Sequence, residues 1–84
     1  METNRIHPGD KIQVMIYNPE GKKIDTYDGS EFHTVGDAVR AAFESSNQNS
    51  EDIRDYVFRV FNATESTSHR YRVNDHGNVK LIVE

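Results

Sequence analysis

The sequence of 84 residues contains no cysteine, and this absence removes several classes of function at once. Without thiols the chain has no disulfide framework, no thiolate zinc site and no cysteine nucleophile. It also lacks an apolar run long enough for a membrane span or for the core of a signal peptide, so we expect a cytoplasmic protein. The five glycines are scattered among expected turns, which excludes a glycine-rich phosphate loop.

Side chains that could carry catalysis are present, but they are not arranged for it. The serines lie in polar segments without the flanking glycines of a nucleophile elbow. No carboxylate lies in an apolar context that would raise its pKa for acid catalysis. A domain of this length also lacks the volume for a deep pocket. We therefore expect no enzyme activity, no cofactor and no small-molecule substrate.

Two further patterns point to sites only weakly. His69, Asp75 and His76 are of residue types that bind metals, but a solvated histidine beside a turn aspartate explains them as well, so we predict no metal site. The segment Asn62-Ala63-Thr64 matches the acceptor pattern for N-glycosylation. Because the sequence shows no secretion signal, we interpret this match as a coincidence.

One long amphipathic helix is predicted within residues 32–46. Its apolar residues recur at helical spacing and form one stripe, made of Val35, Ala38, Val39, Ala42 and Phe43. Thr34 precedes the stripe and Asp37 follows three residues later, which is the pattern of a capping box at a helix start. Asn47 or Asn49 could end the helix in the left-handed conformation.

Alternating apolar and polar residues predict five strands, at residues 11–17, 23–28, 56–62, 69–74 and 79–83. The first two form a hairpin across the turn Asn18-Pro19-Glu20-Gly21, and the turn Asp75-His76-Gly77-Asn78 precedes the last strand. We expect Ile24 and Thr26 to share a face with the apolar residues of the first strand. A short helical turn capped by Ser50 should place Ile53 under the main helix. Residues 1–10 are expected to be a flexible lead-in to a single domain over residues 11–84.

The order of the elements, two strands, one helix and three strands, indicates an α+β fold with the helix packed across a mixed four- or five-stranded sheet. This order resembles the β-grasp, or ubiquitin-like, family over residues 11–83. The resemblance implies that the last strand lies parallel to the first, in the middle of the sheet; a simple meander of the last three strands is the alternative. The chain ends in Leu81-Ile82-Val83-Glu84 rather than Gly-Gly, so the resemblance does not imply a conjugated modifier. It implies a module that binds other proteins through its sheet.

The two faces of the predicted sheet differ in character. The face toward the helix is expected to hold Ile12, Val14, Ile16, Phe58, Val60, Tyr71, Val73, Leu81 and Val83. The other face combines apolar or aromatic residues with cations, although the net charge of the chain is −4. Its candidate partner-binding residues are Met15, Tyr17, Val57, Arg59, Phe61, Arg70, Arg72, Lys80 and Ile82.

This second face suggests two functions besides an ordinary solvated sheet surface. Aromatic, methionine and arginine side chains are typical of interface centres, so the face could bind another protein or a second copy of the chain. Alternatively, the four cations could hold the phosphates of single-stranded nucleic acid while Tyr17, Phe61 and Tyr71 stack on bases. Residues 1–52 carry five Lys and Arg against ten Asp and Glu, which argues against non-specific nucleic-acid binding.

Overall fold

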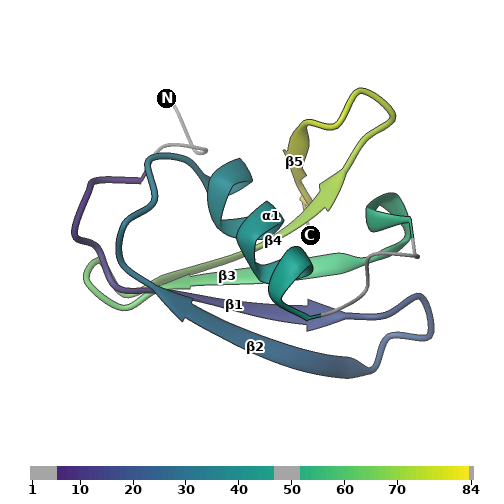
Figure 1. Cartoon of the computed structure of the whole chain (residues 1–84), viewed down its shortest axis with the longest axis horizontal. Helices are drawn as coiled ribbons and strands as arrows, with labels where there is room; N and C mark the ends of the chain where they lie inside the picture. Colours follow the sequence, from purple (N-terminus) through teal and green to yellow (C-terminus); the bar gives the residue numbers. More distant parts are fainter. Residues whose placement is uncertain (1–5, 47–51, 84) are drawn as a thin grey trace.

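The sheet of this α+β protein has five strands in the order β2-β1-β3-β4-β5, each antiparallel to its neighbours. The computed structural model describes residues 6–46 and 52–83. The strands are β1 (Ile12–Tyr17), β2 (Lys23–Gly29), β3 (Val57–Asn62), β4 (Thr67–Val73) and β5 (Val79–Leu81). The helix α1 (Val35–Ser45) lies across one face of the sheet, and a short 3-10 helix, η1 (Ile53–Asp55), precedes β3 (Figure 1). The element order is the predicted one.

The helix α1 begins where the sequence predicts. The Thr34 hydroxyl accepts a hydrogen bond from the Asp37 amide at 3.1 Å, a cap that typically contributes about 1 kcal/mol. The whole predicted apolar stripe is buried in the core that the helix shares with the sheet. The helix ends with the Ser46 amide donating to the Ala42 carbonyl. The predicted caps at Asn47 and Asn49 lie outside the described residues.

Asn18 organises the turn between β1 and β2. The Gly21 amide donates to the Asn18 carbonyl at 2.8 Å, and the Asn18 side chain accepts from the amides of Glu20 at 3.1 Å and Lys22 at 2.9 Å. Gly21 has a φ of +84°, the left-handed conformation that a residue without Cβ adopts at little cost. The predicted turn is confirmed.

The prediction that Ile24 and Thr26 face the helix was wrong. Thr26 lies opposite Met15 on the other face, whereas Tyr27 lies opposite Val14 and packs against the core. Ile24 is 37% exposed. A bulge near the end of β1 places one extra residue in β2, and a shift of one residue moves each side chain to the opposite face.

The β-grasp resemblance implies that the last strand lies beside the first, but the structure does not have this arrangement. β3 occupies that position, antiparallel to β1, and β5 lies at the sheet edge beside β4. The connection explains this placement: the Asn74 amide donates to the Asn78 carbonyl, and the Gly77 amide donates to the Asn74 carbonyl. So tight a turn joins antiparallel neighbours, whereas a parallel strand requires a long crossover. The meander alternative is therefore the one found.

Residues 6–10, expected as part of a flexible lead-in, pack against the domain. Ile6 is 6% exposed, and its amide donates to the His33 carbonyl at 3.0 Å. The carboxylate of Asp10 is buried and accepts a hydrogen bond from Asn62 Nδ2 at 2.9 Å. The folded domain thus begins at least five residues before the predicted boundary at residue 11; residues 1–5 are not described.

Of the residues of the first, third, fourth and fifth strands predicted to face the helix, all are buried except two at the end of the chain. The buried ones are Ile12, Val14, Ile16, Phe58, Val60, Tyr71 and Val73. Leu81 is half-buried and packs against the core. Val83 is 86% exposed, because β5 ends at Leu81 and the predicted strand was two residues too long.

The short helix η1 forms near its predicted place. Its cap is Asp52, whose side chain accepts from the Arg54 amide at 2.9 Å. The predicted cap, Ser50, lies outside the described residues. Ile53 is half-buried against the core, as expected. Within residues 6–46 and 52–83, no helix combines the length and the apolar composition needed to cross a membrane.

Candidate functional site

The sheet face opposite α1, here called the open face, carries the candidate residues. The helix, Ile6 and Ile53 all belong to the core on the other side of the sheet. Arg72 and Lys80 are exposed, and the remaining seven are half-buried. These seven are Met15, Tyr17, Val57, Arg59, Phe61, Arg70 and Ile82. The strand register brings together on one surface eight of the nine residues that the sequence singled out. The ninth, Ile82, follows β5 and lines a hollow with Arg59 and Arg70.

The register aligns the cations in pairs of like charge. Arg59 lies directly opposite Arg70 on β3 and β4, and Arg72 lies opposite Lys80 on β4 and β5. Side chains in such positions have Cβ atoms roughly 5 Å apart, and like charges there destabilise a sheet. The repulsion between Arg72 and Lys80 indicates that this positive charge does not contribute to folding.

Within the residues that the structure describes, neighbouring groups do little to neutralise Arg59, Arg72 and Lys80. Arg59 Nη1 donates to the neutral hydroxyl of Ser68 at 3.3 Å. Within the described part of the chain, no ion pair involves Arg59, Arg72 or Lys80. Polar groups of an interface that are not paired internally are available to a partner of opposite charge.

Arg54 shows the contrasting, internally paired arrangement. Its guanidinium contacts the carboxylates of Asp52 and Asp75, the latter at 3.0 Å. The hydrogen bonds from Arg54 lower the pKa of Asp52 to about 2, and the two carboxylates raise the pKa of Arg54. Arg54 thus serves the fold at the η1 end, whereas Arg59 and Arg72 form no ion pair within the described residues.

One end of the open face contains a small hollow of about 270 Å³, here called the basic pocket. It lies where the β1–β2 turn meets the start of β3. Its lining residues are Tyr17, Asn18, Pro19, Gly21, Asp55, Val57, Arg59, Arg70 and Arg72. The turn residues and Asp55 were not among the predicted site residues, because only the tertiary structure brings the turn and η1 beside the strands.

A second hollow of about 490 Å³ lies around Phe61, toward the opposite end of the same strands. Its lining includes Ile12, Gly29 and Ala63, with the Gln13 amide donating to the Asp28 carboxylate at 3.2 Å. The open face therefore combines a positively charged end with a more apolar end.

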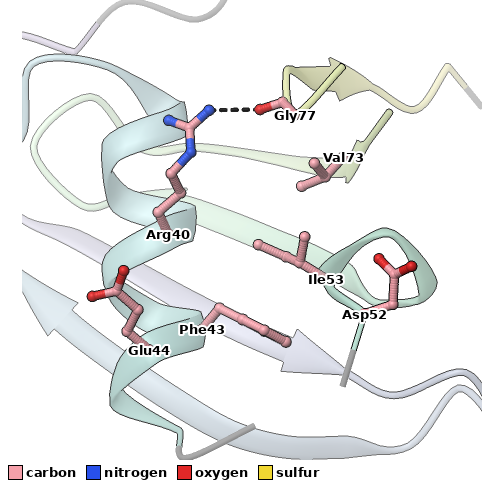
Figure 2. Close-up of a pocket in the computed structure, with 7 residues that line it drawn as sticks. All are labelled: Arg40, Phe43, Glu44, Asp52, Ile53, Val73 and Gly77. Carbon is pink, nitrogen blue, oxygen red and sulfur yellow. Dashed lines mark hydrogen bonds between the residues drawn. The ribbon is translucent and has the colours of Figure 1, made fainter. Parts of the chain in front are cut away.

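The groove between α1 and the β4–β5 hairpin is larger, at about 610 Å³, but it carries no catalytic arrangement (Figure 2). Phe43, Ile53 and Val73 form its apolar part. Arg40 reaches from α1 toward the hairpin and donates to the Gly77 carbonyl. The described lining combines no nucleophile with a general base, because its remaining side chains are the carboxylates Glu44 and Asp52.

Other candidates from the sequence do not form sites in the described residues. No group of three or more His, Cys, Asp or Glu side chains is placed to hold a metal ion there. His69 instead packs edge-on against Tyr71, with ring centroids 6.5 Å apart. Asn62 is 9% exposed and its Nδ2 is bound to Asp10, so the glycosylation pattern falls on a buried amide.

The prediction that Tyr71 stacks on bases at the open face was wrong. Its side chain is 2% exposed and lies on the helix side of β4, where burial raises the pKa of its hydroxyl. The alternation of the strand already separates it from Arg70 and Arg72, which point to the other face. Only Tyr17 and Phe61 remain as aromatic groups of the open face.

Comparison of the chain with protein-family models, with curated proteins and with solved structures finds no match. A function must therefore be inferred from the open face itself.

Proposed function

We propose that this chain is a non-enzymatic binding module whose open face docks an acidic surface of another protein or of a second copy of the chain. The observation that carries the proposal is the strand register, which sets Arg72 opposite Lys80 and Arg59 opposite Arg70. The repulsion between Arg72 and Lys80 works against the fold in the free protein and is relieved when anionic groups of a partner lie over them.

The apolar residues of the open face favour a protein as the partner. Met15, Tyr17, Val57 and Phe61 lie between and beside the cations and are half-buried. Interface centres combine aromatic, methionine and arginine side chains in this way, with the apolar groups supplying area and the arginines orientation. The hollow around Phe61 offers space for an apolar side chain of the partner.

Single-stranded nucleic acid is the second candidate ligand. The observation in its favour is that two half-exposed aromatic rings, Tyr17 and Phe61, share the face with four cations. Bases stack on such rings while cations hold the phosphates. The protein partner is preferred because the chain has no overall basic excess, and because the end of the face around Phe61 holds one cation and one anion, Lys11 and Asp28, rather than an excess of cations.

The test of the protein partner is capture from extracts of the native cell on the immobilised chain. An Arg59→Ser/Phe61→Ser double variant is compared with Lys22→Ser, which also removes one cation but lies in the β1–β2 turn. We expect a partner retained by the wild type and by Lys22→Ser to be lost from the double variant. Sedimentation equilibrium of the same three proteins shows whether the partner is a second copy. Association that is unchanged in the double variant would contradict the proposal.

The nucleic-acid alternative has a separate test in the salt dependence of binding. Four phosphate contacts predict a slope near −3 for the logarithm of the binding constant against the logarithm of salt concentration. Fluorescence anisotropy with a labelled oligothymidylate measures this slope. Binding that is absent or independent of salt would remove nucleic acid as a candidate.

A further inference from the structure

We propose that β5 pairs with the β5 of a second copy of the chain, antiparallel and about a two-fold axis, so that the two sheets join into one. This contact uses the edge of the sheet rather than the open face, so it goes beyond the proposed function. The axis is perpendicular to the sheet, so both helices lie on one side of the joined sheet and both open faces on the other. The proposed docking surface therefore stays accessible in the dimer.

The two edges of the sheet, β2 and β5, differ in their protection against pairing (Figure 1). β2 contains a bulge and carries exposed charges at Lys23, Asp25 and Asp28. The Asp25 carboxylate also accepts a hydrogen bond from the Thr26 amide at 2.8 Å, which engages a backbone donor of this strand. Bulges and charges of this kind keep sheet edges from pairing. The one charged residue of β5 is Lys80, which lies opposite Arg72 on the open face.

The backbone of β5 presents unused hydrogen-bonding groups at the edge. The Ile82 amide donates to the Arg70 carbonyl at 2.8 Å, so these two residues form a hydrogen-bonded pair of the β4–β5 ladder. Hydrogen-bonded and non-hydrogen-bonded pairs alternate along an antiparallel ladder. Val79 and Leu81 therefore direct their N–H and C=O groups outward, and Val83 is next in the same series. Within the described part of the chain, no strand lies beside them.

The side chains of this outward series are all apolar. Val79 is buried and Leu81 is half-buried, whereas Val83 is 86% exposed and is the most exposed large apolar side chain of the described residues. The alternation of the sequence predicts a strand as far as residue 83, but β5 ends at Leu81. A strand paired along its outer side would continue to Val83 and cover it.

The sequence of β5 is complementary to itself in one register. An axis at Leu81 sets this residue opposite its own copy and sets Val79 opposite Val83, so all three pairs are apolar. Lys80 then lies opposite Ile82. A register centred on Lys80 would set two lysines directly opposite each other, which is destabilising. A register centred on Ile82 would leave Val79 beyond the last described residue of the second copy.

The size of the contact indicates a weak dimer. A strand over residues 79–83 is only about 17 Å long. Pairing along such a length buries less than the roughly 1,200 Å² of a standard stable interface. We therefore expect a dissociation constant on the order of 100 µM.

The first measurement is sedimentation equilibrium of the full chain at concentrations from about one tenth to about ten times this value. Amide hydrogen exchange at both ends of the range identifies the edge that pairs. Exchange at Leu81 and Val83 should slow as the concentration rises, whereas Ile82, which is already bonded to β4, should change little. In a mixture of labelled and unlabelled chain, an NMR contact between the Hα atoms of Lys80 and Ile82 of different copies identifies the register.

Two matched variants locate the contact. Val83→Lys places a charge in the outward apolar series, and Ile24→Lys makes the same change at the exposed apolar residue of β2. Because the two-fold axis repeats every lost cross-strand pair, Val83→Lys should raise the dissociation constant about tenfold. Ile24→Lys should leave it unchanged. Both side chains are exposed, and the amide spectrum of each variant verifies its fold.

Three outcomes would overturn the inference. The first is a chain that stays monomeric over the whole concentration range. The second is a dimer that Val83→Lys does not weaken, and the third is a dimer that Ile24→Lys weakens equally, which would assign the contact to β2.

The β5 dimer and association through the open face are separable. The Arg59→Ser/Phe61→Ser variant keeps an intact β5 and should still form the β5 dimer, so association through the open face is measured in the Val83→Lys background. Failure of the β5 dimer leaves the proposed function standing, because its own test is loss of capture in the Arg59→Ser/Phe61→Ser variant.

Discussion

If the cations of the open face serve binding rather than folding, reversing one of them should make the protein more stable. Lys80→Glu converts the repulsion between Lys80 and Arg72 into an attraction, at an exposed position of β5. A cross-strand pair contributes roughly 0.2–1 kcal/mol in either direction. Losing about 0.5 kcal/mol of repulsion and gaining about 0.5 kcal/mol of attraction should stabilise the fold by about 1 kcal/mol.

Urea denaturation followed by circular dichroism measures this change. With a slope of about 1 kcal/mol per molar urea for a small domain, the midpoint should rise by about 1 M. Lys80→Gln, which removes the repulsion without adding an attraction, should show about half of that rise. In 1 M salt the Debye length falls to about 3 Å, so both effects should shrink.

A control substitution separates this local effect from the change in net charge. Lys23→Glu alters the net charge by the same amount, but Lys23 lies opposite Tyr17 rather than opposite a cation. It should leave the urea midpoint nearly unchanged. If Lys80→Glu lowers the midpoint, or if Lys23→Glu raises it equally, the claim that the paired cations work against the fold is refuted. The argument for an anionic partner would lose its main support with it.

Three further predictions concern the fold. Ile16→Val, at a fully buried position of β1, should destabilise the protein by about 1 kcal/mol, whereas Met15→Val on the open face should cost less in the same urea series. Gly21→Ala places a Cβ at a φ of +84° with no neighbouring atom within 4 Å, so a loss of about 1 kcal/mol in thermal denaturation would be purely conformational, and Gly21→Asn should lose less. The pKa of Asp52 is lowered to about 2 by Arg54, so its contribution to stability is present above pH 4 and is lost as the pH falls toward 2. The stability difference between the wild type and Asp52→Asn should shrink over that range, and a difference that is constant from pH 5 to pH 2 would contradict the assignment.

Local chemistry made much of the fold predictable. The helix required an apolar stripe at helical spacing and a capping threonine, and both operate within one segment of sequence. The turn at Asn18 and Gly21 is equally local, because its hydrogen bonds join residues no more than four positions apart. Alternation along β1, β3 and β4 assigned the faces of these strands correctly, including every residue of the open face that lies on them.

The structural predictions failed where the position of a residue depended on another part of the chain. The face of Thr26 depends on a bulge near the β1–β2 turn, and alternation cannot reveal an inserted residue. Ile6 and Asp10 have a polar sequence around them, but His33 and Asn62 hold them in place from elsewhere in the fold. Such contacts leave no local periodic signal.

The sequence by itself determined which residues form the helix, which face of β1, β3 and β4 is apolar and that four cations share the other face. Those properties follow from backbone periodicity and from turn chemistry, which act over a few residues. Only the tertiary structure decided the strand order, because pairing β3 with β1 and β5 with β4 is a choice among alternatives with the same local pattern. It also decided which cations oppose each other and that the β1–β2 turn and Asp55 complete the basic pocket. These relations depend on distances between segments, which the order of residues along the chain does not contain.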